Sequence, residues 1–301
     1  MKCFYHSADL DGHCSGAIVK RRYPECEMIG INYGQEFPWD RILPSEEVFM
    51  VDFSLQPFEE MWRLNNCCIL HWIDHHATAI RDFKLYPEMG KEGRILLKDG
   101  MGACELTWEY LFPLDEIPLA VHWLGRYDVW DHSDVNVLPF QYGMRQFDDT
   151  RPGNQELWSM LLKRRSGMTI PIKNDGRLLM NYEAAQNTKF CRAYAFETVL
   201  KQPLSLMERE GDLAESTHRE FPAICANRGF TNSKVFDSVY DPEKHDLMIT
   251  FCRLKPPAGE WTVSLYSTKP ETDCGEIART FGGGGHKGAA GFQCLELPFE
   301  Y

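Results

Sequence analysis

The chain has 301 residues, of which 44% are hydrophobic and 25% charged, and this is the composition of a folded globular protein with room for two ordinary domains. No run approaches the about 20 apolar residues of a transmembrane helix, and the N-terminal residues lack the apolar segment of a secretory signal, so we expect a cytoplasmic protein without a membrane partner. The formal net charge of −12 argues against long nucleic acid duplexes as ligands, because proteins that bind them usually present a basic surface.

The first part of the chain alternates short apolar runs with helical patterns. Strands are predicted at residues 2–5, 27–32, 48–53 and 67–72, and helices at 12–22, 57–65, 102–110 and 118–127. This alternation predicts an α/β fold whose parallel sheet carries helices on both faces. Ligands of such sheets bind beyond the carboxyl ends of the strands, at a point where the strand order reverses.

The remainder of the chain predicts a helical connector and a second domain. Helices are expected at residues 154–165 and 171–200, and the second is long enough to bridge two domains. Strands at 203–207, 221–226, 247–254 and 261–267, with helices at 233–239 and 275–281, predict a smaller mixed α/β domain. The predicted division is therefore 1–138, a connector over 139–202, and 203–301.

The eleven cysteines do not form the pattern of a disulfide framework or a zinc ribbon. Their number is odd, no C-x-x-C pair occurs, and most of them lie inside apolar runs. Buried, reduced thiols are the better prediction.

Acidic and imidazole side chains follow three of the predicted strands. These residues are His6, Asp9, Asp11, Asp52, Asp74, His75 and His76. Because the carboxyl ends of parallel strands share one edge of the sheet, we expect them to converge there. Crowded buried carboxylates repel each other, and divalent cations resolve the conflict. Carboxylates combined with imidazoles suit Mn²⁺ first, with Mg²⁺, Co²⁺ or Fe²⁺ as alternatives.

Each of these motifs taken alone has a structural explanation. An Asp-x-Asp-Gly sequence is a common helix N-cap, and a single aspartate such as Asp52 at a strand end is usually structural. The Asp74-His75-His76 run is rarer, since neighbouring imidazoles do not assist packing. The coincidence of all three motifs at successive strand ends favours a functional site.

These motifs resemble those of the DHH phosphoesterase superfamily, which includes RecJ-like exonucleases, oligoribonucleases, cyclic-dinucleotide phosphodiesterases and exopolyphosphatases. The matching segments are His6-x-x-Asp9-x-Asp11-Gly12, Val51-Asp52-Phe53-Ser54 and Asp74-His75-His76. The fourth motif of the superfamily is an aspartate after a helix, and Asp128 matches it better than Asp131.

The resemblance implies a two-metal site and assigns a role to each residue. One metal would be held by His6 and Asp9, the other by Asp11, His75 and Asp128, with Asp52 bridging the two. Two such metals activate a water molecule for attack on phosphorus. His76 would face the phosphate and stabilise charge in the transition state, and Asp74 would orient a neighbouring ligand.

A glycine-rich segment near the C-terminus is similar to the signature of the DHH-associated C-terminal domain. Four successive glycines, including Gly283, Gly284 and Gly285, let the backbone approach a phosphate, and a following helix N-terminus would add positive potential. His286 and Lys287 offer further hydrogen-bond donors. Four glycines alone are more often a flexible loop, but this run occurs in the expected order after the metal motifs.

The chain departs from the family on the strand that precedes the glycines. Nucleotide-cleaving relatives often carry an arginine there, and this sequence has Tyr266, which could stack on a base or only pack. Arg253, Lys255 and Lys269 could replace the missing charge. This departure leaves the substrate open, though not the chemistry.

The function that we expect is hydrolysis of short phosphodiesters: linear dinucleotides, oligoribonucleotides or nucleotide bisphosphates. Exopolyphosphatase or pyrophosphatase activity is an alternative within the superfamily. An alternative of another class is a catalytically silent sensor of a nucleotide, although such a sensor would be expected to have lost a metal ligand. The sequence does not decide whether the substrate is cyclic or linear, or whether the protein forms a homodimer.

Overall fold

The computed structural model describes the chain except residues 93, 165, 204–217 and 257–258 and the side chains of residues 90–92 and 286. The end of the predicted helix 154–165 and residues 204–207 of a predicted strand lie outside the described residues. By internal contacts the chain divides into two compact units, Met1–Met180 and Asn181–Tyr301.

The first unit contains the predicted parallel sheet. Its five strands, in the order β2-β1-β3-β4-β5, all pair in parallel. The strands are β1 (Lys2–His6), β2 (Glu27–Ile31), β3 (Glu47–Val51), β4 (Ile69–Asp74) and β5 (Ile95–Leu97). The order reverses between β1 and β3, and a crevice at the carboxyl ends of these two strands is where α/β sheets bind ligands.

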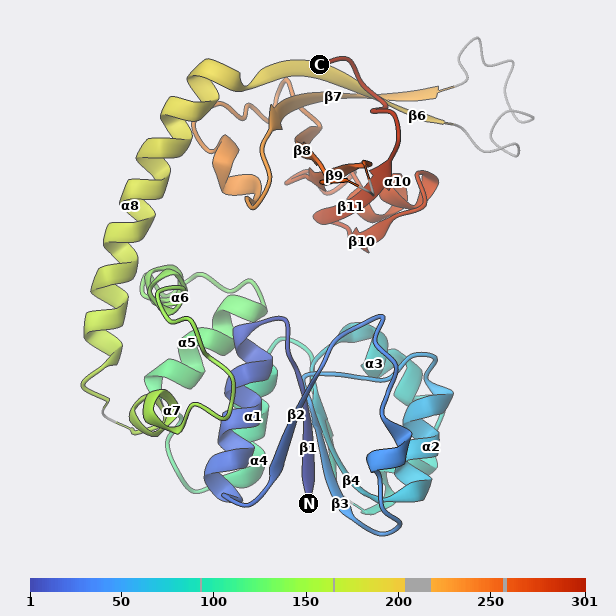
Figure 1. The fold of residues 1–301 in the computed structure, drawn as a ribbon, viewed down its shortest axis with the longest axis vertical. Helices are drawn as coiled ribbons and strands as arrows, with labels where there is room; N and C mark the ends of the chain where they lie inside the picture. Colours follow the sequence, from blue (N-terminus) through green and yellow to red (C-terminus); the bar gives the residue numbers. More distant parts are fainter. Residues whose placement is uncertain (93, 165, 204–217, 257–258) are drawn as a thin grey trace. The chain divides into compact units, whose positions relative to one another are not determined.

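Helices cover both faces of this sheet, as predicted. Figure 1 shows α1 (Leu10–Arg22) and α4 (Ala103–Leu111) on one face and α2 (Glu59–Cys67) and α3 (Ala77–Phe83) on the other. A second layer behind α1 and α4 shares their apolar core. It consists of α5 (Leu119–Asp128), α6 (Val137–Met144), α7 (Gln155–Leu161) and the first part of α8 (Thr169–Tyr194).

The second unit contains a mixed sheet, which also matches the prediction. Its strand order is β10-β11-β9-β8-β7-β6, and all pairs are antiparallel except β7 with β8. The strands are β6 (Phe196–Pro203), β7 (His218–Asn227), β8 (Leu247–Arg253), β9 (Trp261–Tyr266), β10 (Gly284–His286) and β11 (Ala289–Cys294). Helix α10 (Cys274–Thr280) contributes Ile277 and Ala278 to the core of this unit.

Two sequence predictions of secondary structure are wrong. The helix predicted over 171–200 ends at Tyr194, and β6 begins at Phe196, because all eight residues of β6 pair with β7. Pairing with a distant strand overrides local helix preference. The glycine run is followed by strand β11 and not by a helix, and the helix start that lies beside it belongs to the preceding helix α10, whose Cys274 amide donates to the carbonyl oxygen of Lys287 at 2.9 Å.

The cysteines and the helices fit two of the composition-based predictions. All eleven cysteines are free thiols, and most of them are buried. Among the described residues, none of the helices combines the length and the hydropathy that a transmembrane segment requires.

Candidate metal centre

The turn between β1 and α1 brings three of the predicted ligands together. His6 is the last residue of β1, and Asp9 is the N-cap of α1, where its Oδ1 accepts a hydrogen bond from the Gly12 amide at 2.9 Å. A Cβ atom at Gly12 would lie 2.1 Å from the carbonyl oxygen of His6, so only glycine permits this tight reversal. The reversal places Asp11 in the first turn of α1, close to the strand end.

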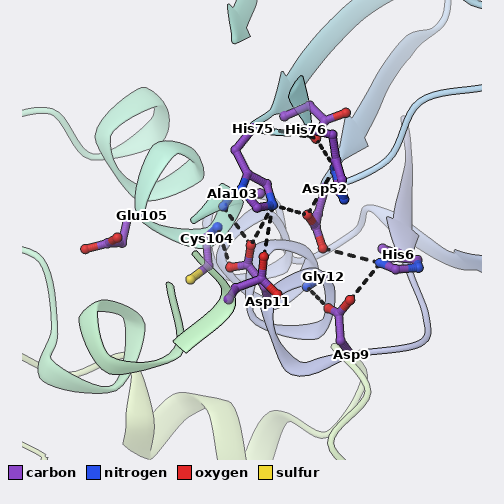
Figure 2. Close-up of polar contacts among 12 residues, drawn as sticks. His6, Asp9, Asp11, Gly12, Asp52, His75, His76, Ala103, Cys104 and Glu105 are labelled. Carbon is purple, nitrogen blue, oxygen red and sulfur yellow. Dashed lines mark hydrogen bonds and ion pairs between the residues drawn. The ribbon is translucent and has the colours of Figure 1, made fainter. Parts of the chain in front are cut away.

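Asp11 is fixed by a contact that the sequence reasoning missed. Its Oδ2 accepts a hydrogen bond from the Ala103 amide at 2.7 Å, and its Oδ1 accepts one from the Cys104 amide at 2.9 Å (Figure 2). These are the first amides of α4, whose N-cap residue, Gly102, has no side chain to cap them. Asp11 therefore caps α4 from a position about 90 residues earlier in the chain. The one sign of this contact in the sequence was that α4 begins after Gly102, which has no side chain to cap the helix.

Asp52 follows β3 directly and is 1% exposed. Its backbone has φ +56°, a left-handed conformation that aspartate tolerates better than most residues. Since β3 lies beside β1, Asp52 lies next to His6 across the sheet: its Oδ2 is 3.6 Å from His6 Nδ1. Its Oδ1 is 3.2 Å from His75 Nε2. One oxygen of this carboxylate thus faces each histidine, as Figure 2 shows.

The side chains of Asp74, His75 and His76, at the end of β4, point in different directions. Asp74 Oδ1 accepts hydrogen bonds from the backbone amides of His75 and His76 at 2.7 and 3.2 Å. It also lies 2.6 Å from His76 Nδ1, which donates to it. Asp74 therefore holds His76 in one tautomer, with the proton on Nδ1 and Nε2 as the remaining ring nitrogen. His75 points the other way, toward Asp11, Asp52 and Asp128.

Asp128, the last residue of α5, lies 3.0 Å from His75 Nε2 through its Oδ2. Asp131, the alternative for the fourth motif, faces elsewhere, since its carboxylate accepts a hydrogen bond from the Ser133 amide and lies 3.7 Å from Arg126. The structure therefore brings Asp128, and not Asp131, to the site. Sequence reasoning preferred the same residue.

Helix α5 is held against α4 by contacts that the sequence did not reveal. Gly102 and Gly125 are so close that a Cβ atom at Gly102 would lie 2.3 Å from the Cα of Gly125. Beside this contact the buried carboxylate of Glu105 accepts hydrogen bonds from His122 at 2.8 Å and from Arg126 Nε at 3.0 Å. These contacts fix the position of α5, whose last residue is the candidate ligand Asp128.

The predicted ligands form two of the three groups of potential metal ligands in the described part of the chain, and the third group, Asp52, Asp74, His75 and His76, shares Asp52 and His75 with them. His6, Asp9 and Asp52 make one group. Asp11, His75 and Asp128 make the other. Within each group, one potential ligand atom per residue lies within 4.8 Å of all the others. Because Asp52 directs its second oxygen toward His75, it occupies the place of a bridging carboxylate between the groups.

The hydrogen bonding of the centre leaves suitable atoms for metal ions. His6 Nε2 donates to Asn32 Oδ1 at 3.3 Å, an oxygen that also accepts from the Tyr33 amide, so Nδ1 is the nitrogen that carries the lone pair when His6 is neutral. That Nδ1, His75 Nε2 and both oxygens of Asp52 are buried and have no hydrogen-bond partner in the described part of the chain. Buried polar atoms without partners are costly, and a cation would satisfy all four. The residues therefore fit two divalent metal ions.

The pKa shifts follow from burial and from the crowding of like charges. Burial and the neighbouring Asp52 and Asp128 raise the pKa of Asp11, and burial raises that of Asp52. Burial alone would lower the pKa of His6, but contacts with Asp52 and Asp9 raise it to about 10. Contacts with Asp128 and Asp52 likewise outweigh burial and raise the pKa of His75 to about 11. The metal-free centre thus retains protons in the positions where cations would supply positive charge.

The glycine run of the second unit forms a hairpin between β10 and β11. Gly285 has φ +144°, and a Cβ atom there would lie 2.5 Å from the Cα of Ala290. A Cβ atom at Gly283 would lie 2.1 Å from the carbonyl oxygen of Gly291, whereas Gly284 has open space around it. Close packing within the hairpin therefore explains two of these glycines. The side chain of the predicted donor His286 lies outside the described residues.

The other predicted substrate contacts do not form one cluster. Tyr266 pairs with Ala289 of the glycine hairpin, and Lys287 is exposed on the same hairpin. Arg253 pairs with Trp261 at the opposite end of β9, and its Nε donates to the carbonyl oxygen of Gly259. Lys269 is engaged with Asp246 at 2.7 Å. The sheet register thus keeps Tyr266 and Lys287 near each other and separates Arg253 from them.

Comparison with known proteins gives distant matches. No protein-family model matches the chain. An uncharacterized protein, R106, of Acanthamoeba polyphaga mimivirus is 27% identical over 285 residues, covering 89% of this chain and 58% of that protein. The chain thus spans little more than half of the length of this relative.

Solved structures that match the chain have low sequence identity. A pGpG-specific phosphodiesterase, PggH from Vibrio cholerae, has a TM-score of 0.48 and 14% identity, with 97% of this chain and 92% of that chain covered. An exopolyphosphatase-related protein from Bacteroides fragilis matches with a TM-score of 0.43 and 14% identity, and the match covers 98% of this chain and 87% of that chain. RecJ from Thermus thermophilus in complex with Mg²⁺ matches with a TM-score of 0.41 and 15% identity, and the match covers 97% of this chain and 46% of that chain.

Proposed function

We propose that this chain is a DHH-type phosphoesterase that uses two divalent cations, Mn²⁺ first among them, to hydrolyse short phosphodiesters. The observation that carries the proposal is the position of Asp52, whose two buried oxygens face His6 and His75 at 3.6 and 3.2 Å and have no hydrogen-bond partner among the described residues. In the metal-free protein the two imidazoles are the charged partners of these oxygens, and a buried carboxylate in this position is suited to bind a cation on each side. When bound, two cations supply Lewis-acid activation of water and neutralise charge on the phosphate.

The metal ligands would be the six residues of the two groups. They are His6, Asp9, Asp11, Asp52, His75 and Asp128. The Ala103 and Cys104 amides fix the Asp11 carboxylate, and Asn32 fixes the ring of His6. Ligands whose orientation is set by such partners keep their geometry through the reaction. All six lie within residues 1–138, which we propose as the catalytic domain.

His76 is the residue that we assign to the substrate. Burial lowers its pKa, but the hydrogen bond and the charge of Asp74 outweigh burial and raise it. Its Nδ1 donates to Asp74, so in the protonated ring, which the raised pKa favours, Nε2–H is the group that can donate a proton or a hydrogen bond to a phosphate oxygen. Asp74 would act by orienting this ring.

The substrate class that we propose is linear dinucleotides, short oligoribonucleotides or nucleotide bisphosphates. The net charge of −12 is unfavourable for long duplexes. Amides of the glycine hairpin, together with Lys287 and Tyr266, are proposed to contact a phosphate or a base of such a small substrate. We propose residues 203–301 as the domain that makes these contacts, after the connector over 139–202.

The test is a screen of dinucleotides, short oligomers, cyclic dinucleotides and polyphosphate in the presence of Mn²⁺. We expect release of mononucleotide from a linear dinucleotide, loss of this activity in excess chelator, and its abolition in His75→Ala and Asp74→Ala. The matched pair Asp128→Asn and Asp131→Asn adds a control, because only the first should be inactive. Full activity of His75→Ala would refute the proposal. Faster phosphate release from polyphosphate would favour an exopolyphosphatase, and binding without turnover would favour a sensor.

A further inference from the structure

A cavity of about 430 Å³ lies beside the candidate metal centre within the first unit. It is formed by the loop after β2 and by the segment after β3. Phe53 and Leu55, 3% and 5% exposed, are its buried residues, and Phe37 and Trp39 are half-buried residues that line it. Tyr33, also in the lining, is 47% exposed.

Two residues that line the cavity are directly connected to residues of the metal centre. Phe53 follows Asp52 in the chain, and the carbonyl oxygen of Phe53 accepts a hydrogen bond from the Trp72 indole at 3.0 Å. On the other side, Asn32 lines the cavity and accepts a hydrogen bond from His6. A group attached to a phosphate at the metal centre therefore has this cavity as a neighbouring space.

Tyr33 is held at the boundary between the cavity and the centre. Its ring centroid lies 4.5 Å from that of Phe53 and 5.7 Å from that of His6. The loop that carries it is ordered by hydrogen bonds: Asn32 Oδ1 accepts from the Tyr33 amide at 2.8 Å, and Gln35 Oε1 accepts from the Asn32 amide at 2.9 Å. A large aromatic side chain that is half exposed yet fixed in position can stack on a ligand at little cost in conformational entropy.

The polar groups of the cavity select against anions. Its lining includes the amides of Gln35 and Gln56 and the carboxylates of Glu36 and Glu60, and no lysine or arginine is among its described lining residues. A neighbouring cation, Arg63, stacks on Trp39 at 3.8 Å and pairs with Glu60, so it is already engaged. A polyphosphate chain would meet carboxylates here, whereas a neutral aromatic heterocycle finds rings to stack on and acceptors for its N–H groups.

We infer that this cavity binds a nucleobase of the substrate, with Tyr33 as the residue on which the base stacks. The inference rests on the proposed phosphoesterase function and makes it more specific, because one base of the nucleotide substrate contributes to its recognition within the metal-binding unit. Stacking of a base on an aromatic side chain is worth enough to change affinity by about tenfold or more.

The test compares a linear dinucleotide with two analogues in which one or the other nucleotide lacks its base, in Mn²⁺ buffer. The variants are Tyr33→Ala, Tyr33→Phe, which keeps the ring, and Tyr182→Ala, which removes a tyrosine that is 66% exposed on α8. We expect Tyr33→Ala to raise KM for the dinucleotide about tenfold with little change in kcat, and to leave one of the abasic analogues unaffected. Tyr33→Phe, which keeps the stacking ring, should recover most of the affinity that Tyr33→Ala loses, and Tyr182→Ala should behave as the wild type does.

A binding measurement separates this inference from the proposed function. By calorimetry, a nucleoside 5′-monophosphate should bind at least about tenfold more tightly than ribose 5-phosphate to the wild type, and this difference should disappear in Tyr33→Ala. Such a result without any hydrolysis would keep the base site and refute the phosphoesterase. Hydrolysis of abasic and intact dinucleotides with equal KM, or equal binding of the two phosphates, would overturn the base site and leave the phosphoesterase standing.

Discussion

At the scale of single residues, Asp52 is the side chain that joins the two candidate ligand groups. Its oxygens face two separate ligand groups, and its left-handed backbone places them there directly after a buried strand. Substitution with asparagine keeps the shape of the side chain but removes the charge that two cations would share. The effect should therefore fall on metal binding and not on folding.

We expect Asp52→Asn to lose Mn²⁺-dependent hydrolysis by more than about 100-fold, since replacing even a residue that only orients a ligand costs about 10- to 100-fold. In chelator, the variant should unfold at the same temperature as the wild type or higher, because one of several crowded carboxylates has been neutralised. A hydrolysis assay measures the first effect, and thermal unfolding with and without Mn²⁺ measures the second. A variant that is still stabilised by Mn²⁺ as strongly as the wild type would contradict the bridging role.

Protons and cations compete for the same atoms, which predicts a pH dependence. The pKa values of about 10 for His6 and about 11 for His75 exceed the ordinary value of about 6.5. Their contribution to the stability of the metal-free protein is therefore fully present below pH about 6.5 and is lost as pH rises toward 10. Binding of a cation must release these protons, so the increase in melting temperature caused by Mn²⁺ should be larger at pH 8 than at pH 6. An increase that is the same at both pH values would contradict this competition.

Local patterns in the sequence predicted most of the candidate ligands, because these residues lie at or just after strand ends, whereas Asp128 was predicted from the resemblance to the fourth motif of the DHH superfamily. The supporting contacts were not visible. Asp11 binds amides of residues about 90 positions away, and Tyr33 gains its role from Phe53 and His6, which approach it only in the folded chain. Local patterns identify reactive side chains, whereas the partners that orient them depend on tertiary structure.

At the scale of elements, the contact between α4 and α5 positions the centre. Asp11 binds the first amides of α4, and Asp128 ends α5, so a shift between these helices would move one candidate ligand relative to another. Gly102 and Gly125 allow the two helices to touch through their backbones.

Gly102→Ala should separate these helices, because the added Cβ atom would lie 2.3 Å from the backbone of Gly125. We expect a loss of about 1–3 kcal/mol in the free energy of unfolding, typical of overpacking, together with a fall in kcat. Gly153→Ala is the matched control, since a Cβ atom there meets nothing within 4 Å. Urea unfolding and steady-state kinetics measure the two effects. Wild-type stability of Gly102→Ala would show that the contact is not tight.

The elements that the sequence missed are short or depend on distant pairing. Strand β5 has three residues, and α3 and α6 have seven and eight, too few for a clear hydrophobic period. Strand β6 follows α8 with one residue between them, and only its ladder with β7 distinguishes it from a continued helix. The glycine run was predicted to be a loop before a helix. It is instead part of a hairpin, in which Gly283 lies close to Gly291 and Gly285 lies close to Ala290.

At the scale of the whole molecule, charge and topology point to a small substrate. The order of the parallel sheet places the ends of β1 and β3 side by side, and the candidate centre lies at this reversal. The alternation of strands and helices in the sequence predicted the parallel sheet, but the order of its strands is set by packing that no local pattern records. The net charge of −12 provides little attraction for a long phosphate backbone.

This charge predicts a weak dependence on salt. Proteins that neutralise many phosphates lose about 10³- to 10⁵-fold in affinity between 50 and 200 mM salt. We expect KM for a dinucleotide to change by less than about tenfold over that range, and a 20-base-pair duplex to stay uncut. Efficient cleavage of the duplex, or a steep salt dependence of KM, would show that a long nucleic acid is the substrate.

The central claim is that two divalent cations, shared through Asp52, cleave a short phosphodiester. Its most direct test is a titration of the metal-free protein with Mn²⁺, in which bound metal and the rate of dinucleotide hydrolysis are measured on the same samples. The account predicts that the rate rises with occupancy and reaches its plateau at two Mn²⁺ ions per chain. A plateau at one ion per chain, or hydrolysis in the absence of bound metal, would contradict it.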